Sequence, residues 1–283
     1  MKKIKLLLCL FMLTTLCGCS NSNKNESSKT LNAAMFWIST SLDPTNNYDG
    51  WVLSRVGVGE TLLKLNEKYE VEPCLAKSYE QIDDTTWKLT LKDSITFSNG
   101  KKVTGENVKA CLERAFEKNT RAIDYFDLNH VEAKGQDIYL YLNKSSGAIL
   151  NNLCEPLFTI YDASQSEEDI ANHPLCTGPF VVDDFVSEKT IDTSKNKKYY
   201  DGKAKLDHVH FSQVADSDAR VLALQSGEVD LANTIDYSSL KLFRNNKDYQ
   251  VLEVLGPRTN VIYMNNETTF LSDLTIRKAL SYS

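Results

Sequence analysis

The sequence contains none of the short motifs that mark the common catalytic centres. It has no GxSxG nucleophile turn, no HExxH zinc helix and no glycine-rich phosphate loop. None of its seven cysteines forms a CxxC pair, which argues against a zinc site. These absences remove the best-defined enzyme classes. We therefore expect a protein that is not an enzyme, binds no resident metal and uses no cofactor.

Excess basic charge and long apolar runs are also missing. Lysine and arginine number 32 against 38 acidic residues, and the net charge of −6 argues against nucleic acid as a partner. After residue 18, no segment approaches the roughly 20 apolar residues that a transmembrane helix needs. With 283 residues and 42% hydrophobic content, the chain can form one large domain or two modest ones.

The first residues have the composition of an export signal. Lys2, Lys3 and Lys5 precede an apolar run from 6 to 16 that is too short for a stable membrane anchor. Leu16-Cys17-Gly18-Cys19 follows and resembles a bacterial lipobox, in which the last cysteine is lipidated. The sequence predicts a signal peptide over 1–18 and a lipidated flexible tether over 19–30. The expected location is the extracytoplasmic face of the cell membrane. The alternative is an ordinary signal peptide with a coincidental cysteine.

Four cysteines remain beyond the lipobox: Cys74, Cys111, Cys154 and Cys176. Outside the cytoplasm a disulfide can form and persist. Cys154 and Cys176 are the closest in sequence and are the possible pair. Four buried thiols are the equal alternative, because sequence alone does not determine connectivity.

Periodicity predicts a mixed α+β or α/β fold. Strict alternation indicates strands at 87–92 and 138–142, and apolar positions spaced by three and four residues indicate a helix capped by Thr104. A second helix begins at Asp216 or Ser217 and ends near Gly227. Further strands are expected at 31–38, 208–211, 229–231 and 261–264, with a helix and a short strand over 52–65 and a final helix from 273 or 276.

Eight stretches in the same order resemble the extracellular solute-binding proteins of ABC importers, the family that takes up peptides and nickel complexes. Each stretch is short, and their shared order carries the resemblance. The stretches are Leu42-Asp43-Pro44, Glu60–Lys64, Pro73–Tyr79, Thr86–Gly100, Thr177–Phe180, Asp216–Ala232, Val261–Asn265 and Ile276–Leu280.

The resemblance implies two lobes that close around a solute and dock on an ABC permease. It places the first lobe at 31–258, with an inserted subdomain at about 66–165, and the start of a second lobe at 259–283. Members of the family continue past this point, so we expect a chain truncated after its first lobe. A lone-lobe interaction protein, a peptide sensor and a non-functional truncated binder are the alternatives.

The resemblance also indicates three regions that line the solute side of the first lobe. Aromatic side chains suit such surfaces because they combine a rigid apolar area with a polar group. Core packing is the competing interpretation for each residue. The candidates are Tyr48, Trp51, Val52, Tyr125, Phe126, Glu155 and Phe158.

An oligopeptide or a related small solute is the expected ligand. Nickel-complex binders of this family often carry an arginine near the third region, where this sequence has Glu155 and Pro156. A nickel complex is therefore the less expected solute. His208 and His210 share one face of a strand, but two ligands without a third do not make a metal site.

Overall fold

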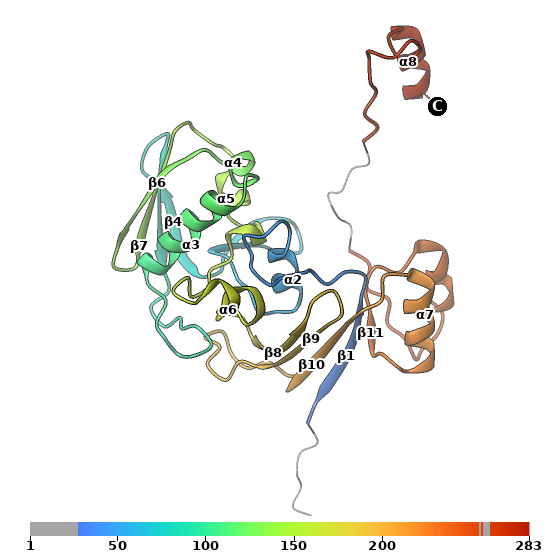
Figure 1. The fold of residues 1–283 in the computed structure, drawn as a ribbon, viewed down its shortest axis with the longest axis horizontal. Helices are drawn as coiled ribbons and strands as arrows, with labels where there is room; N and C mark the ends of the chain where they lie inside the picture. The colour runs from blue at the N-terminus through green and yellow to red at the C-terminus, as the bar shows by residue number, and fades with distance from the viewer. Residues whose placement is uncertain (1–27, 255, 257–260, 283) are drawn as a thin grey trace, which may run out of the picture. The chain divides into compact units, whose positions relative to one another are not determined.

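The computed structural model describes residues 28–254, 256 and 261–282 (Figure 1). The chain separates into two compact units, with the boundary between Asp236 and Tyr237. The expected signal peptide and Cys19 lie outside the described residues, and the lobe boundary expected at 258 stays a prediction. In the part that is described, no helix has the length and apolar character needed to cross a membrane.

A mixed five-stranded sheet forms one half of the first unit, in the order β11-β1-β10-β9-β8. β1 pairs in parallel with both β10 and β11, whereas β9 is antiparallel to β10 and to β8. The mixed α/β class is thus confirmed. β1 and β10 begin at the same end of the sheet, which is the end at which β9 finishes. The strands are β1 (Thr30–Met35), β8 (Phe180–Val186), β9 (Thr190–Lys195), β10 (His208–Gln213) and β11 (Leu231–Ala232).

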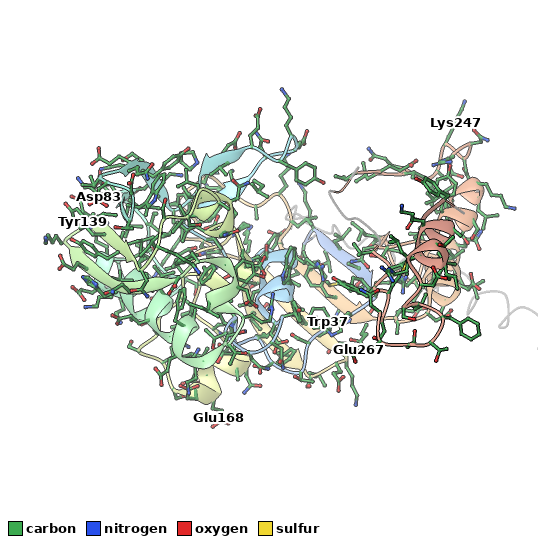
Figure 2. All side chains as sticks on the ribbon, turned by 90° about the horizontal axis from the view of Figure 1, so that it is seen from above. Trp37, Asp83, Tyr139, Glu168, Lys247 and Glu267 are labelled. Carbon is green, nitrogen blue, oxygen red and sulfur yellow. The ribbon has the colours of Figure 1, made fainter. Side chains whose placement is uncertain are left out.

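An antiparallel four-stranded sheet forms the other half, in the order β4-β5-β7-β6. Its alternation was the strongest strand signal, and Leu89 and Leu140 are fully buried on the inner face. Tyr139 lies on the opposite, outer face (Figure 2). The strands are β4 (Ala76–Gln81), β5 (Thr86–Leu91), β6 (Leu128–Lys134) and β7 (Asp137–Leu142); a separate small ribbon pairs β2 (Leu63–Leu65) with β3 (Val71–Pro73).

Helix α3 (Gly105–Lys118) covers the inner face of the four-stranded sheet, against β6 and β7 (Figure 1). Its start agrees with the prediction, since Thr104 and Asn107 form a reciprocal capping box. Val108, Cys111, Leu112 and Ala115 on one face are buried. The spacing of these residues was therefore sufficient to identify both the helix and its buried face.

Helix α7 (Ser217–Ser226) also begins and ends at the predicted residues. The Asp216 carboxylate accepts a hydrogen bond from the Ala219 amide at 2.8 Å. Gly227 ends the helix with φ of +76°, a conformation that glycine adopts without strain. The buried Arg220 guanidinium donates to backbone carbonyls at the ends of β10 and β11, and so ties these strands to the helix.

Short helices complete both units. The strand expected at 261–264 is absent, because this segment does not pair with another described strand. The helix expected from 273 is present and begins after Asp273. The remaining helices are α2 (Gly50–Arg55), α4 (Ala122–Tyr125), α5 (Ile149–Asn152), the 3-10 helix η1 (Pro156–Phe158) and α6 (Glu167–Asn172) in the first unit, and η2 (Tyr237–Leu242) and α8 (Leu274–Tyr282) in the second.

The four described cysteines are free thiols, so the possible disulfide between Cys154 and Cys176 is not formed in this structure. Each sits in its own packing site: Cys111 Sγ donates to the Tyr161 carbonyl at 3.1 Å, and Cys154 Sγ donates to the Leu150 carbonyl. Burial raises the pKa of Cys154 to about 11, which keeps this thiol protonated and unreactive at neutral pH.

Candidate functional site

The turn at Asp43 organises the loop that carries the first candidate residues. The Asp43 carboxylate accepts hydrogen bonds from the Thr45 amide and hydroxyl at 2.9 and 2.8 Å. Arg114, on α3, clasps the same carboxylate with two bonds of 2.8 and 2.7 Å. Burial alone would raise the pKa of Asp43, but the bonds from Arg114 and Thr45 outweigh it and hold the pKa below its usual value.

Arg114 links this loop to two further elements. Its guanidinium also donates to the Tyr161 hydroxyl at 2.8 Å and to the Glu167 carboxylate of α6 at 2.5 Å. The arginine side chain is only 11% exposed, and Asp43 is similarly covered. A buried charge needs this degree of hydrogen bonding, so the loop, α3 and α6 are held together as one assembly.

The residues that follow α3 hold the tip of the same loop. The Asn119 side-chain amide donates to the carbonyls of Thr45 and Asn47, each at 3.1 Å. Arg121 donates to the Asn47 carbonyl at 2.9 Å. Asn47 has φ of +43°, a conformation that asparagine tolerates better than most residues. These bonds fix the backbone immediately before Tyr48.

Residues from three distant parts of the chain then meet around Arg121. Its guanidinium lies 3.7 Å from the centroid of the Tyr48 ring and donates to the Tyr125 hydroxyl at 2.6 Å. It also forms an ion pair with Glu155 at 3.8 Å. Glu155 in turn accepts a hydrogen bond from the Trp51 indole at 2.9 Å. We call these five residues the arginine–aromatic cluster.

The arginine–aromatic cluster reaches the surface of the unit. Tyr48 is 55% exposed and Trp51 is 38% exposed, whereas Arg121 and Glu155 are largely covered. Burial, and secondly the Glu155 carboxylate, raise the pKa of Tyr125 to about 12, so its phenol stays neutral. A partly covered guanidinium and carboxylate beside accessible aromatic rings can bind a small polar solute that carries both signs of charge.

Three of the expected site residues are core residues instead. Val52 lies on the inner face of α2 and is fully buried. Phe126 and Phe158 pack on each other with ring centroids 5.0 Å apart, and both are nearly inaccessible. The ring centroids of Tyr125 and Phe158 are 5.7 Å apart. The two phenylalanine rings therefore pack on the buried side of the arginine–aromatic cluster and do not face a solute.

The approach of α2 to the η1 helix requires a glycine. A Cβ atom at Gly50 would lie 2.4 Å from the Pro156 carbonyl oxygen, which is too close for any other residue without movement. This contact brings Trp51 next to Glu155 although 104 residues separate them. The pairing of the first and third predicted regions thus depends on a small residue that the sequence pattern did not single out.

Arg121 is the central residue that the sequence reasoning missed. No arginine is near Glu155 in the sequence, and this was the reason for disfavouring a nickel complex. In the structure Arg121 lies close to Glu155, with an ion-pair distance of 3.8 Å. The sequence offered one indication of its role, because Arg121 precedes Tyr125 and Phe126 in a segment already expected to line the solute site.

One carboxylate behind the cluster has no cation bonded to it in its described contacts. Asp49 is 2% exposed, and its Oδ2 accepts a hydrogen bond from the Asn46 side chain at 2.6 Å. Burial, with a contribution from the negative charge of Asp43, raises the pKa of Asp49 to about 6. Asp49 lies between Tyr48 and the first residue of α2. Its protonation therefore affects the stability of the loop that positions Tyr48.

Histidine does not form a metal centre in the described part of the chain. His210 Nδ1 lies 2.6 Å from Asp192 Oδ1 on the neighbouring strand, and His208 is exposed. Within residues 28–254, 256 and 261–282, no group of three or more histidine, cysteine or acidic side chains is arranged to hold a metal ion.

Comparison with known families identifies the class of protein. The family model for bacterial extracellular solute-binding proteins, family 5, matches residues 70–283. The chain therefore belongs to this family, as the eight ordered stretches indicated.

Particular relatives narrow the comparison. The nickel-binding protein NikA of Staphylococcus aureus is 32% identical over 94% of this chain and 53% of its own length. The glutathione-binding protein GsiB of Escherichia coli is 27% identical over 86% of this chain and 50% of its own length. This chain thus spans about half the length of the curated relatives it matches. These relatives are named as binding proteins, in agreement with the lack of catalytic motifs.

Solved structures share the fold. The structure of Staphylococcus aureus NikA with Ni(L-His)2 superposes with a TM-score of 0.73, 32% identity and coverage of 78% of this chain and 46% of that one. A nickel ABC transporter structure from Bacillus halodurans superposes with a TM-score of 0.73 and 28% identity. The match covers 89% of this chain and 53% of that one. The Helicobacter pylori DppA structure with a peptide, at 22% identity and a TM-score of 0.66, supports the fold alone.

Proposed function

We propose that this chain is the solute-binding part of a lipid-anchored receptor that delivers a small solute to an ABC permease. Family membership supports the role, and the arginine–aromatic cluster supports the location of the solute. The lipid is attached at Cys19 in this proposal, on the basis of the Leu16–Cys19 lipobox. The protein then acts at the extracytoplasmic face of the cell membrane.

The solute in this proposal carries the amino and carboxylate groups of an amino acid. Arg121 is the observation that carries the proposal: it is partly covered, held by two tyrosines, and faces a carboxylate at 3.8 Å. Arg121 pairs with a solute carboxylate, and Glu155 pairs with its ammonium group. Short peptides and amino-acid chelates of nickel both belong to this class. The names of the NikA and GsiB relatives fit the same chemistry.

Isothermal titration of the chain from Ser20 onward tests the solute. L-histidine with and without nickel, glutathione and short peptides form the panel. Arg121→Met should abolish binding of any solute that the parent binds. Arg121→Lys should retain part of it, because lysine keeps the charge but loses the two-pronged geometry. Lys118→Met removes a nearby exposed cation and is the matched control. Unchanged binding by Arg121→Met would contradict the assignment.

Metabolic labelling tests the anchor independently. Cells supplied with a labelled fatty acid should yield labelled protein, and Cys19→Ala should remove the label. Label that persists in the variant would show that Cys19 is not the lipid site.

An interaction protein is the second candidate, favoured by the surface of the second unit. Ile262, Tyr263 and Phe270 are each at least 75% exposed in that unit. Apolar residues exposed together are typical of association surfaces. Light scattering of the pure chain distinguishes the candidates. A monomer that binds a solute of the panel supports the receptor, whereas an oligomer that binds none supports the interaction protein.

A further inference from the structure

A concentrated basic segment stands out on this acidic protein. Residues 195–208, here the basic loop, contain five lysines and two aspartates in a chain whose net charge is −6. Lys195 is paired with Asp207. Lys197, Lys203 and Lys205 are exposed. The loop therefore carries surplus positive charge in contact with solvent.

The basic loop lies where the chain enters the five-stranded sheet. It joins the end of β9 to the start of β10, and His208 pairs with Thr30, the first residue of β1. The backbones of Lys29 and Asp207 are also bonded, with the Asp207 amide donating to the Lys29 carbonyl at 2.8 Å. The segment that precedes residue 28 is consequently joined to the fold directly beside this loop.

Neighbouring lysines extend the same basic surface. Lys198 Nζ donates to the Asn99 carbonyl at 2.6 Å, which places the turn containing the exposed Lys102 next to the loop. Lys92 Nζ lies 5.0 Å from the centroid of the Tyr200 ring. Asp93 is the acidic residue next to Lys92, and it is paired with Lys77 at 3.3 Å. Asp183, which accepts a hydrogen bond from the Ser194 hydroxyl at 2.8 Å, and the exposed Asp201 offset part of this charge, and the lysines remain in excess.

We propose that the basic loop binds the anionic phospholipid surface beside the lipid anchor. This inference rests on the proposed attachment of lipid at Cys19. The ten residue-to-residue steps from Cys19 to Lys29 span at most about 35 Å, and a random coil of that length averages about 18 Å between its ends. Anionic headgroups attract lysines within a Debye length, about 8 Å at physiological salt, and a tether this short returns the loop to that layer repeatedly.

The consequence is a defined orientation of the first unit. The basic loop holds the edge of the sheet where β1 begins against the membrane. β1 runs from that end of the sheet and leads into the loop that carries Tyr48 and into helix α2, which carries Trp51. The arginine–aromatic cluster is therefore reached from the end of the strand that leads away from the lipid surface.

Vesicle sedimentation tests the proposal without any solute and without the anchor. The chain from Ser20 onward retains every described residue and lacks the lipid site. It should bind vesicles of equal parts phosphatidylcholine and phosphatidylglycerol, and not vesicles of phosphatidylcholine alone. Replacing Lys197, Lys203 and Lys205 by glutamine should weaken binding by about a hundredfold, since each lysine near an anionic surface contributes about fivefold.

A second triple variant controls for net charge. Glutamine at Lys68, Lys118 and Lys144 removes the same charge from exposed positions outside the basic loop and should leave binding within about twofold. Thermal unfolding of both variants checks that the fold is retained. Equal losses in the two variants, or no binding of the parent chain to anionic vesicles, would overturn the proposal. Failure of the solute titration or of the fatty-acid labelling leaves these readouts unchanged, so the outcomes are separable.

Discussion

The two units of the chain differ in burial far more than in local structure. The first unit, through Asp236, contains two large sheets and the β2–β3 ribbon, with a continuous core of buried side chains. Among the described residues of the second unit, Phe243 is the buried hydrophobic residue, whereas Tyr263 is 92% exposed. Lys247 and Glu267 of this unit extend away from its ribbon (Figure 2). Among the described residues, helices form in both units, but an extensive buried core is seen in the first.

The largest difference is expected for two arginine–carboxylate pairs. Arg114 clasps Asp43 inside the first unit, and Arg244 clasps Glu253 on the surface of the second with bonds of 2.8 to 3.1 Å. Arg114→Met should lower the free energy of unfolding by about 4 kcal/mol, because it leaves a buried carboxylate uncompensated. Arg244→Met should change it by less than about 1 kcal/mol.

Urea unfolding followed by circular dichroism measures both values. Asp43→Asn added to Arg114→Met is the matched control, since it removes the orphaned charge and should recover part of the loss. A small effect of Arg114→Met alone would mean that the loop around Asp43 is not held by this pair.

A smaller contrast is expected for leucine truncations. Leu89 is fully buried on the inner face of the four-stranded sheet, so Leu89→Ala should cost about 3 kcal/mol through lost burial and a residual cavity. Leu274 of α8 is 55% exposed, and Leu274→Ala should change stability by less than about 0.5 kcal/mol. Thermal unfolding of the two variants would break the comparison if their midpoints shifted equally.

The same division explains what could be predicted from sequence. The caps of α3 and α7, at Thr104 and Asp216, are local and were identified by residue type and spacing. The alternating strands were identified for the same reason. The strand expected at 261–264 failed because a short apolar run forms a strand only when a neighbouring strand pairs with it.

Long-range proximity limited the prediction of the candidate site. Tyr48, Trp51 and Glu155 were named from their regions, and the structure brings them together. Arg121 was not named, because its contacts span the chain from Asn47 to Glu155 and have no periodic signature. Residue types indicated aromatic candidates but did not distinguish the exposed Tyr48 from the buried Phe158.

A pH-dependent contrast is the smallest of the expected effects. Burial raises the pKa of Asp49 from 3.8 to about 6 in the folded first unit. Between these values the folded chain binds more protons than the unfolded chain, so stability falls as pH rises. The contribution of the neutral acid is complete below about pH 4 and is lost as pH passes through about 6. Asp49→Asn should therefore stabilise the protein at neutral pH by up to about 2 kcal/mol and flatten the profile between pH 4 and 6.

Asp273 of the second unit has a pKa shift of the opposite sign to that of Asp49 and provides the comparison. It is exposed, and hydrogen bonds from the first turn of α8 lower its pKa, beginning with the Thr275 amide at 2.7 Å. Stability from Asp273 is present above its unfolded pKa and is lost as pH falls through the lower folded value. Asp273→Asn should consequently lower the helical signal above the unfolded pKa of Asp273 and leave it unchanged at strongly acidic pH, where both side chains are neutral. Asp49→Asn has the opposite sign, because it raises stability as pH rises toward and beyond about 6. Coincident pH profiles for the two variants would show that burial does not separate these carboxylates.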